Sequence, residues 1–240
     1  MMDAMANLES ETAPDLGALY RDVRSAFTAA VQALPDEAFG RKIPACNVWS
    51  VKDLVAHASG VVDDVTNGRL DGAGSDPWTE LQVKAAKDVP VAELLARWSE
   101  QAPNLETLLS NSPPSMMTAR LVIDMVTHLW DLAGVTGKRP EKDAAFTFAL
   151  NGYASAFGHR IKKAELPAVR LSSGTWDYVA GAGNAEVTVE ADDVEFFRGL
   201  SGRRSERQVL GWDWDDEPRP YIEYVSNFGE LAPHEVNEAF

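Results

Sequence analysis

Two separate segments of the chain carry side chains that could bind a metal ion together. Asp124 and His128 are four residues apart, so on a helix they lie one turn apart on the same side. His57 lies in another segment, PACNVWSVKDLVAHASG at 44–60, at the border of an apolar helical stripe. Two histidines and a carboxylate leave a divalent cation with open positions for water or substrate, which is typical of catalytic sites.

The same residues fit a plainer interpretation as well. Helices commonly carry polar pairs at this spacing, so Asp124 could belong, with Arg120 and Asp131, to a solvated strip of ion pairs. His57 would then be an ordinary histidine at the edge of a core. The spacing alone leaves both interpretations open.

The segment of Asp124 and His128 is predicted to be a central helix, over about residues 115–133. Its apolar side chains cover about 200° of the helix circumference, about twice what a surface helix needs. The remaining arc collects one polar strip, made of Arg120, Asp124, Thr127, His128 and Asp131. A polar strip on an otherwise apolar helix indicates a functional role, so this segment says more about function than any other part of the sequence.

His57 is predicted to lie on a second helix. Ser50 is a good N-cap residue, and Asp53 follows three residues later in a variant of the capping box. The helix is expected to end near Gly68. Residues 69–77, RLDGAGSDP, have the composition of turns and are expected to form a loop that could cover a site.

Helical periodicity also appears in three other stretches: one that ends at Pro35, one over 91–109 and one over about 142–163. The helix over 91–109 is expected to bend or break around Pro103. Together these helices predict an antiparallel helical bundle over residues 14–163, after a polar, disordered tail at 1–13. Cys46, Trp49 and Trp130 are expected to pack in its core.

Beyond Pro167 the apolar residues alternate, which is typical of short strands. Strands are expected around 169–171, 176–180 and 185–191, followed by a helix that Asp192 caps. A small α+β domain over residues 164–240 therefore follows the bundle, and the predicted fold class is α+β overall.

Composition narrows the classes of partner. With 37 acidic and 22 basic residues the formal net charge is −15, which would repel nucleic acid and an anionic membrane surface. The single cysteine cannot form an internal disulfide, and the sequence has neither a transmembrane-length apolar run nor the features of a signal peptide. We therefore expect a cytoplasmic protein that binds neither nucleic acid nor membranes.

Two motifs resemble those of a known family. PACNVWSVKDLVAH, at 44–57, resembles the P-x-C-x-x-W-[ST]-V-x-D-L-x-x-H signature of the mycothiol-dependent maleylpyruvate isomerase N-terminal domain, a branch of the DinB-like metal-binding four-helix bundles. ARLVIDMVTHLWDL, at 119–132, is similar to the family's second signature, in which E-x-x-x-H precedes a W-D-L ending. The resemblance implies a DinB-like four-helix bundle with His57, Asp124 and His128 as metal ligands.

Asp124 departs from the family pattern, which has glutamate at this position. One methylene less shortens the reach of the carboxylate by about 1.5 Å, whereas metal–ligand distances tolerate about 0.2 Å. The expected consequence is a metal site that is weaker, bridged by water or changed in geometry.

The C-terminal stretch DDVEFFRGLSGRRSERQVLGWDW, at 192–214, resembles the second domain that follows this bundle in many such proteins. In the isomerase an arginine of that domain is implicated in activity, and Arg203 is the best match, with Arg204 next to it. An arginine would suit an acidic substrate. The alternative is a charged helix end without function, since cations are favourable there.

The resemblance implies a mycothiol-dependent isomerase or S-transferase. A divalent cation, with zinc expected from the donor set, would activate a low-molecular-weight thiol for attack on a small electrophilic, acidic substrate. Two alternatives stay open: a hydrolase in which the same metal activates water, and a non-catalytic protein of the superfamily that binds a small molecule.

Overall fold

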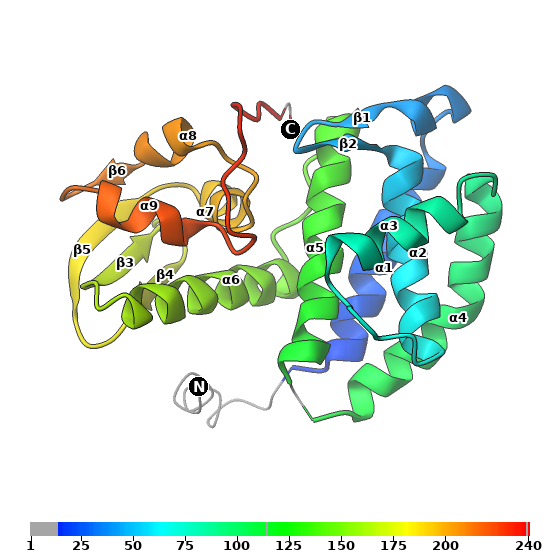
Figure 1. Ribbon diagram of the computed structural model, residues 1–240, viewed down its shortest axis with the longest axis horizontal. Helices are drawn as coiled ribbons and strands as arrows, with labels where there is room; N and C mark the ends of the chain where they lie inside the picture. Colours follow the sequence, from blue (N-terminus) through cyan, green and yellow to red (C-terminus); the bar gives the residue numbers. More distant parts are fainter. Residues whose placement is uncertain (1–13, 114, 239) are drawn as a thin grey trace. The chain divides into compact units, whose positions relative to one another are not determined.

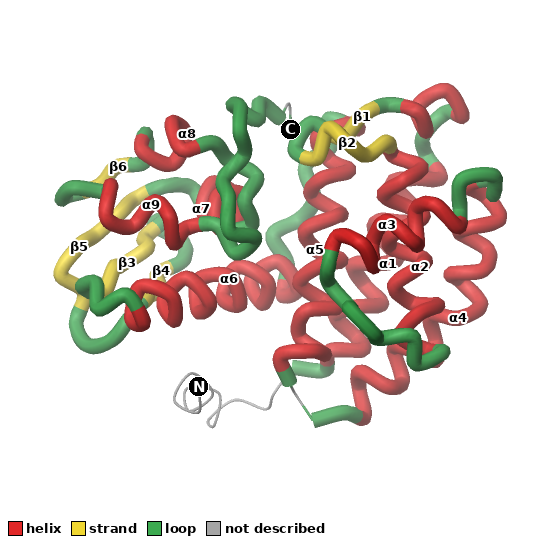
Figure 2. Tube along the Cα trace, in the orientation of Figure 1, coloured by secondary structure: helices red, strands yellow, loops and turns green. Residues whose placement is uncertain are grey.

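The computed structural model describes residues 14–113, 115–238 and 240, and the tail expected at 1–13 lies outside them. The described residues divide into two compact units, one formed by residues up to 141 together with 238 and 240, the other by residues 142–237. The first is helical, with one short hairpin, and the second combines helices with a sheet (Figure 2). The α+β fold class expected from the sequence is thus confirmed.

The first unit is built on four long helices, α1 (Leu16–Gln32), α2 (Val51–Thr66), α4 (Val91–Asn111) and α5 (Met116–Thr136). Helix α1 packs on α4 and α5, and α2 packs mainly on α4, with a much smaller contact to α5 (Figure 1). Apolar side chains fill the interior of this four-helix bundle; among those most deeply buried are Phe27, Leu54, Trp98, Leu105, Val122 and Trp130.

Local sequence signals fix where α2 and α5 begin. Ser50 accepts a hydrogen bond from the Asp53 backbone, and the Asp53 side chain accepts one from the Ser50 backbone, so the expected capping box is confirmed. Ser115 and Thr118 form the same reciprocal arrangement at the start of α5. Gly137 caps α5 in the left-handed conformation, so the helix ends at Thr136, three residues beyond the expected end at about 133.

Two elements near α2 were not expected. Strands β1 (Lys42–Ile43) and β2 (Cys46–Ser50) form a short antiparallel hairpin that leads into α2. Helix α3 (Asp76–Ala85) begins within the turn-like stretch at 69–77 and packs on α2 (Figure 1). The sequence gives only a weak indication of this helix, because only one of its residues is buried and no apolar stripe results.

Of the bend or break expected around Pro103, the break is absent, since α4 runs through this residue. Proline removes one backbone donor from the helix, and the carbonyl of Ser99 thereby loses its usual partner. Both Pro103 and Ser99 are exposed, so water can bind this carbonyl.

The second unit is built around a four-stranded sheet. Its strands are β3 (Ala168–Ser172), β4 (Asp177–Ala180), β5 (Ala185–Glu190) and β6 (Asp213–Trp214), in the order β4-β3-β5-β6. Strand β3 is antiparallel to β4 and parallel to β5. The helices of this unit are α6 (Ala144–Lys163), α7 (Asp193–Leu200), α8 (Glu206–Leu210) and α9 (Arg219–Val225).

Helix α6 belongs to the second unit, whereas the sequence analysis assigned it to the bundle and placed the boundary at residue 163. Phe146 and Tyr153 of α6 pack against Phe197 of α7, with ring centroids 5.2 and 5.7 Å apart. At Gly158 a β-carbon would lie 2.7 Å from the Gly181 backbone, so glycine lets α6 approach the end of β4. Helical periodicity reports that a face is buried but not which neighbour buries it.

Among the described residues, no helix is long and apolar enough to cross a membrane.

Candidate metal centre

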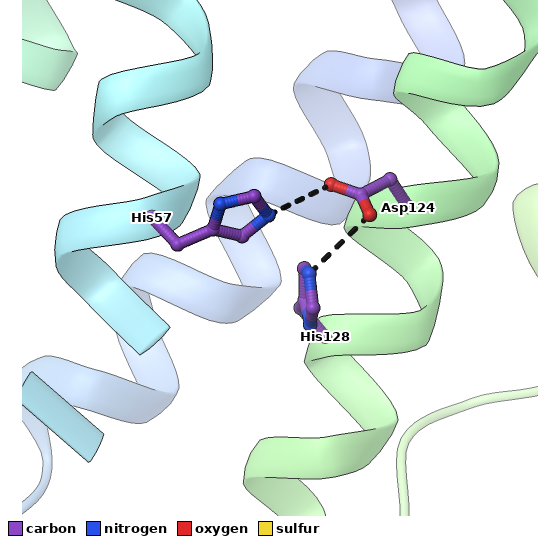
Figure 3. Close-up of side chains that lie close together, drawn as sticks. All are labelled: His57, Asp124 and His128. Carbon is purple, nitrogen blue, oxygen red and sulfur yellow. Dashed lines mark ion pairs between the residues drawn. The ribbon is translucent and has the colours of Figure 1, made fainter. Parts of the chain in front are cut away.

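His57 of α2 and the pair Asp124 and His128 of α5 converge on one point, where these two helices meet (Figure 3). The Nε2 atom of His57 lies 3.5 Å from Oδ2 of Asp124, and Nε2 of His128 lies 3.3 Å from Oδ1. The two imidazole rings are nearly perpendicular, with centroids 5.0 Å apart. Two segments that are about seventy residues apart in the sequence therefore supply one cluster of donor atoms.

The spacing of the three donor atoms fits a single divalent cation. Tetrahedral coordination at the usual distances of about 2.0–2.2 Å places neighbouring ligand atoms about 3.3–3.6 Å apart. The two carboxylate–imidazole distances, each to a different oxygen of Asp124, lie within this range, and one ligand atom from each residue can be chosen so that all three lie within 4.8 Å of one another. The side chain of Asp124, although shorter than the glutamate of the family pattern, therefore reaches both histidines.

Burial distinguishes the two histidines from the carboxylate. His57 and His128 are each only 5% exposed, whereas the side chain of Asp124 is 39% exposed. Among the described residues, the buried Nε2 atom of His128 has no hydrogen-bond partner, although it lies 3.3 Å from Oδ1 of Asp124. A buried nitrogen that faces a carboxylate without a hydrogen bond is what a metal ligand looks like before the cation binds.

Electrostatics also favour a cation at this point. Burial by itself would raise the pKa of the Asp124 carboxyl group, but attraction to His128 and His57 outweighs it and holds the pKa well below its usual range. Burial would likewise lower the pKa of His128, but Asp124 and Asp131 together raise it to about 9. The cluster is therefore one that stabilises positive charge.

A second carboxylate stands behind His128. Asp131, on the same helix, is fully buried, and its Oδ2 lies 3.2 Å from Nδ1 of His128. A carboxylate can only accept here, so Nδ1 carries the proton and the lone pair of a neutral imidazole is on Nε2, facing Asp124. In a solvated strip of ion pairs Asp131 would be exposed, and its complete burial rules that role out.

The corresponding neighbour of His57 comes from another helix. Nδ1 of His57 lies 2.8 Å from Oε1 of Gln82 in α3, and Nε2 of Gln82 donates to Asp64 of α2 at 2.8 Å. Gln82 was not identified from the sequence, where a glutamine among Leu81 and Val83 carries no signal of a site.

Trp49 of β2 covers both imidazoles. Its ring centroid lies 5.0 Å from that of His57 and 5.9 Å from that of His128. The sequence analysis expected this residue to pack in the core, and it packs instead against the donor residues. Trp130, in contrast, is a core residue as expected.

Arg203 lies in the second unit, in the turn after α7. Its Nη1 donates to the backbone carbonyl of Ser201 at 2.6 Å, and its guanidinium lies over the Phe228 ring, 5.2 Å from the centroid. Arg204 is buried and donates through Nε and Nη2 to both carboxylate oxygens of Glu195. The pairing of Arg204 is structural, and the catalytic role expected for Arg203 stays a prediction.

Comparisons with known proteins agree with the motifs. A family model described as the mycothiol maleylpyruvate isomerase N-terminal domain matches residues 20–133, which include all three donor residues. A comparison with functionally curated proteins gives no significant match.

Two solved structures resemble the chain over most of its length. They are crystal structures of the mycothiol-dependent maleylpyruvate isomerase, one without a mutation and one with a histidine replaced by alanine, with TM-scores of 0.57 and 0.56. Each is 13% identical to this chain, and each match covers 83% of this chain and 91% of the other. At this identity the likeness shows a common fold. Together with the family model over residues 20–133, it shows that the chain contains a domain of the mycothiol maleylpyruvate isomerase N-terminal type.

Proposed function

We propose that this protein is a mycothiol-dependent, metal-assisted isomerase or S-transferase that acts on a small, electrophilic and acidic substrate. One observation carries the proposal: His57, Asp124 and His128 bring three donor atoms within 4.8 Å of one another inside the region that the family model matches. The two crystal structures that share this fold are of a mycothiol-dependent enzyme, which supports the choice of thiol.

His57, Asp124 and His128 would hold the metal, and zinc suits this donor set best. Two neutral imidazoles and one carboxylate are typical protein ligands of catalytic zinc, with at least one coordination position left for another molecule. Asp131 and Gln82 orient the two imidazoles so that each Nε2 faces the same point.

The exposed side of the carboxylate indicates where small molecules would enter. Both histidines are buried and Trp49 covers their rings, whereas Asp124 is partly open to solvent. A thiol and a substrate would thus approach past Asp124, while the Trp49 ring packs against the two imidazoles. Bound there, a divalent cation would lower the pKa of a thiol from about 8.5 and supply a thiolate at neutral pH.

Arg203 is proposed to bind the acidic group of the substrate or of the thiol cofactor. A guanidinium is the side chain best suited to a carboxylate, because it forms two parallel hydrogen bonds. Exchanging Arg203 for lysine keeps the charge and removes this geometry, so the substrate KM of Arg203→Lys is expected to rise. We further propose a cytoplasmic location, where the thiol cofactor stays reduced.

Metal analysis tests the site. Protein purified without chelator should contain about one zinc per chain, and His57→Ala should lose it, whereas His159→Ala, which removes an exposed histidine of the second unit, should retain it. Equal metal content in the wild type and His57→Ala would refute the site.

The thiol is tested separately. In cobalt-substituted protein, mycothiol should change the visible absorption spectrum, because a sulfur ligand would enter the coordination sphere. An unchanged spectrum together with thiol-free turnover of an ester or amide would point to a hydrolase instead.

A further inference from the structure

The residue that helix α3 buries against the bundle is polar, whereas its apolar residues Trp78 and Val83 are only half-buried. Gln82 is the one buried residue of this helix and is 7% exposed, whereas its neighbour Leu81 is 66% exposed. A helix that was attached by hydrophobic packing alone would turn its leucine inward. The orientation of α3 therefore depends on what Gln82 contacts.

Gln82 contacts α2 at two points, and these contacts determine where the protons lie. Asp64 is an acceptor that Arg69 also contacts, at 2.8 Å, so the group of Gln82 that faces Asp64 must be the amide NH₂. The carbonyl oxygen of Gln82 then faces His57, and because it can only accept, Nδ1 of His57 must carry a proton. The lone pair of a neutral His57 is consequently on Nε2.

Gly60 makes this contact sterically possible. A β-carbon at Gly60 would lie 2.8 Å from Cβ and 2.9 Å from Cγ of Gln82. Glycine is disfavoured inside a helix relative to alanine. Its presence one turn after His57 fits a helix that has to leave room for α3.

We propose that Gln82 is a positioning residue of the metal centre. It holds His57 with Nδ1–H toward α3 and Nε2 toward Asp124 and His128. The segment 69–85, which contributes no metal ligand, thereby sets the metal affinity of the site. The inference rests on the proposed metal site and adds to it a residue that acts through His57.

Zinc affinity tests the proposal. Gln82→Leu has a similar size without polar atoms and should weaken zinc binding by about 10- to 100-fold, the usual effect of removing the hydrogen-bond partner of a ligand histidine. Leu81→Ala is the matched control on the same helix, and it should bind zinc as the wild type does. Dissociation constants are measured by competition with a chelator, at one pH, on protein whose fold is checked by circular dichroism.

A second variant leaves Gln82 unchanged. Gly60→Ala should also weaken zinc binding, although alanine favours the helix, because the added methyl group pushes Gln82 away from His57. This variant keeps the proposal testable if Gln82→Leu fails to fold.

The third measurement needs no metal. In metal-free protein with ¹⁵N-labelled histidine, His57 should show an Nδ1–H that exchanges slowly with water, and Gln82→Leu should lose this protection. A general loosening of the fold would not single out one imidazole nitrogen.

The outcomes separate this inference from the proposed function. If the wild type binds no zinc, the proposed function fails, and the His57 signal still decides whether Gln82 positions that residue. If Gln82→Leu is folded and retains wild-type zinc affinity, or leaves the His57 signal unchanged, the inference is overturned.

Discussion

The two histidines of the candidate metal centre are held by different means. On α5, His128 is oriented by Asp131, three residues further along the same helix. On α2, His57 is oriented by Gln82, which lies 25 residues further along the chain on a separate helix. The α5 side is therefore assembled as soon as one helix forms, whereas the α2 side requires that α3 docks. One half of the site depends on helix geometry, and the other half depends on tertiary packing.

The largest expected effect comes from removing a ligand on either side. His128→Ala should weaken zinc binding by more than about 100-fold, which exceeds the usual effect of losing a hydrogen-bond partner of a ligand. Chelator competition measures the loss, with His159→Ala as the control. If His128→Ala bound zinc tightly while His57→Ala did not, the two halves would not belong to one site.

The pH dependence of zinc binding should come mainly from the α5 side. The raised pKa of His128, about 9, means that this imidazole is protonated at pH 7 in the metal-free protein, and zinc must displace the proton. Apparent zinc affinity should thus rise up to about tenfold per pH unit and level off above about pH 9.

The same pKa has a consequence for the stability of the metal-free protein. Because the folded state binds the His128 proton more tightly than the unfolded state does, this stabilisation is complete below about pH 6.5 and is lost as the pH rises through about 9. Thermal unfolding of metal-free protein between these values measures it. A zinc affinity that does not change with pH, together with a constant melting temperature, would contradict the charge assignment.

Asp131→Asn compares the two orienting contacts directly. The amide keeps the shape of the side chain but removes the charge behind His128, and zinc affinity should fall about 10- to 100-fold. The fall should be at least as large as that of Gln82→Leu, because hydrogen bonds to a charged acceptor are stronger than those to a neutral one. A larger effect of Gln82→Leu would mean that the α3 contact dominates.

The smallest effect is expected for Asp124→Glu, which restores the residue type of the family pattern. The oxygens of Asp124 already lie 3.3 and 3.5 Å from the two imidazole nitrogens, and the side chain is 39% exposed, so a longer side chain has room to adjust. Zinc affinity should change less than about tenfold, the lower end of the effect of a lost hydrogen-bond partner. A large gain in affinity would show that the aspartate impairs the site.

The local signals in the sequence were sufficient for much of the fold. The capping box of Ser50 and Asp53 and the long apolar segment of α5 predicted two helices near their observed bounds, because caps and periodicity act within a few residues. Alternation beyond Pro167 predicted the strands β3, β4 and β5 for the same reason. Helix α3 and the short hairpin were missed, since neither buries enough apolar surface to leave a pattern.

By itself, the sequence determined which residues share a helix face, so the pairing of Asp124 with His128 followed from their spacing. The approach of His57 to that pair was a hypothesis from the donor types, and the family motifs strengthened it. Tertiary structure alone decided that Asp131 is buried, that Gln82 reaches His57 from α3, and that Trp49 lies against both histidines. The physical reason is that spacing along a chain fixes contacts within a helix, whereas contacts between helices depend on how whole faces pack.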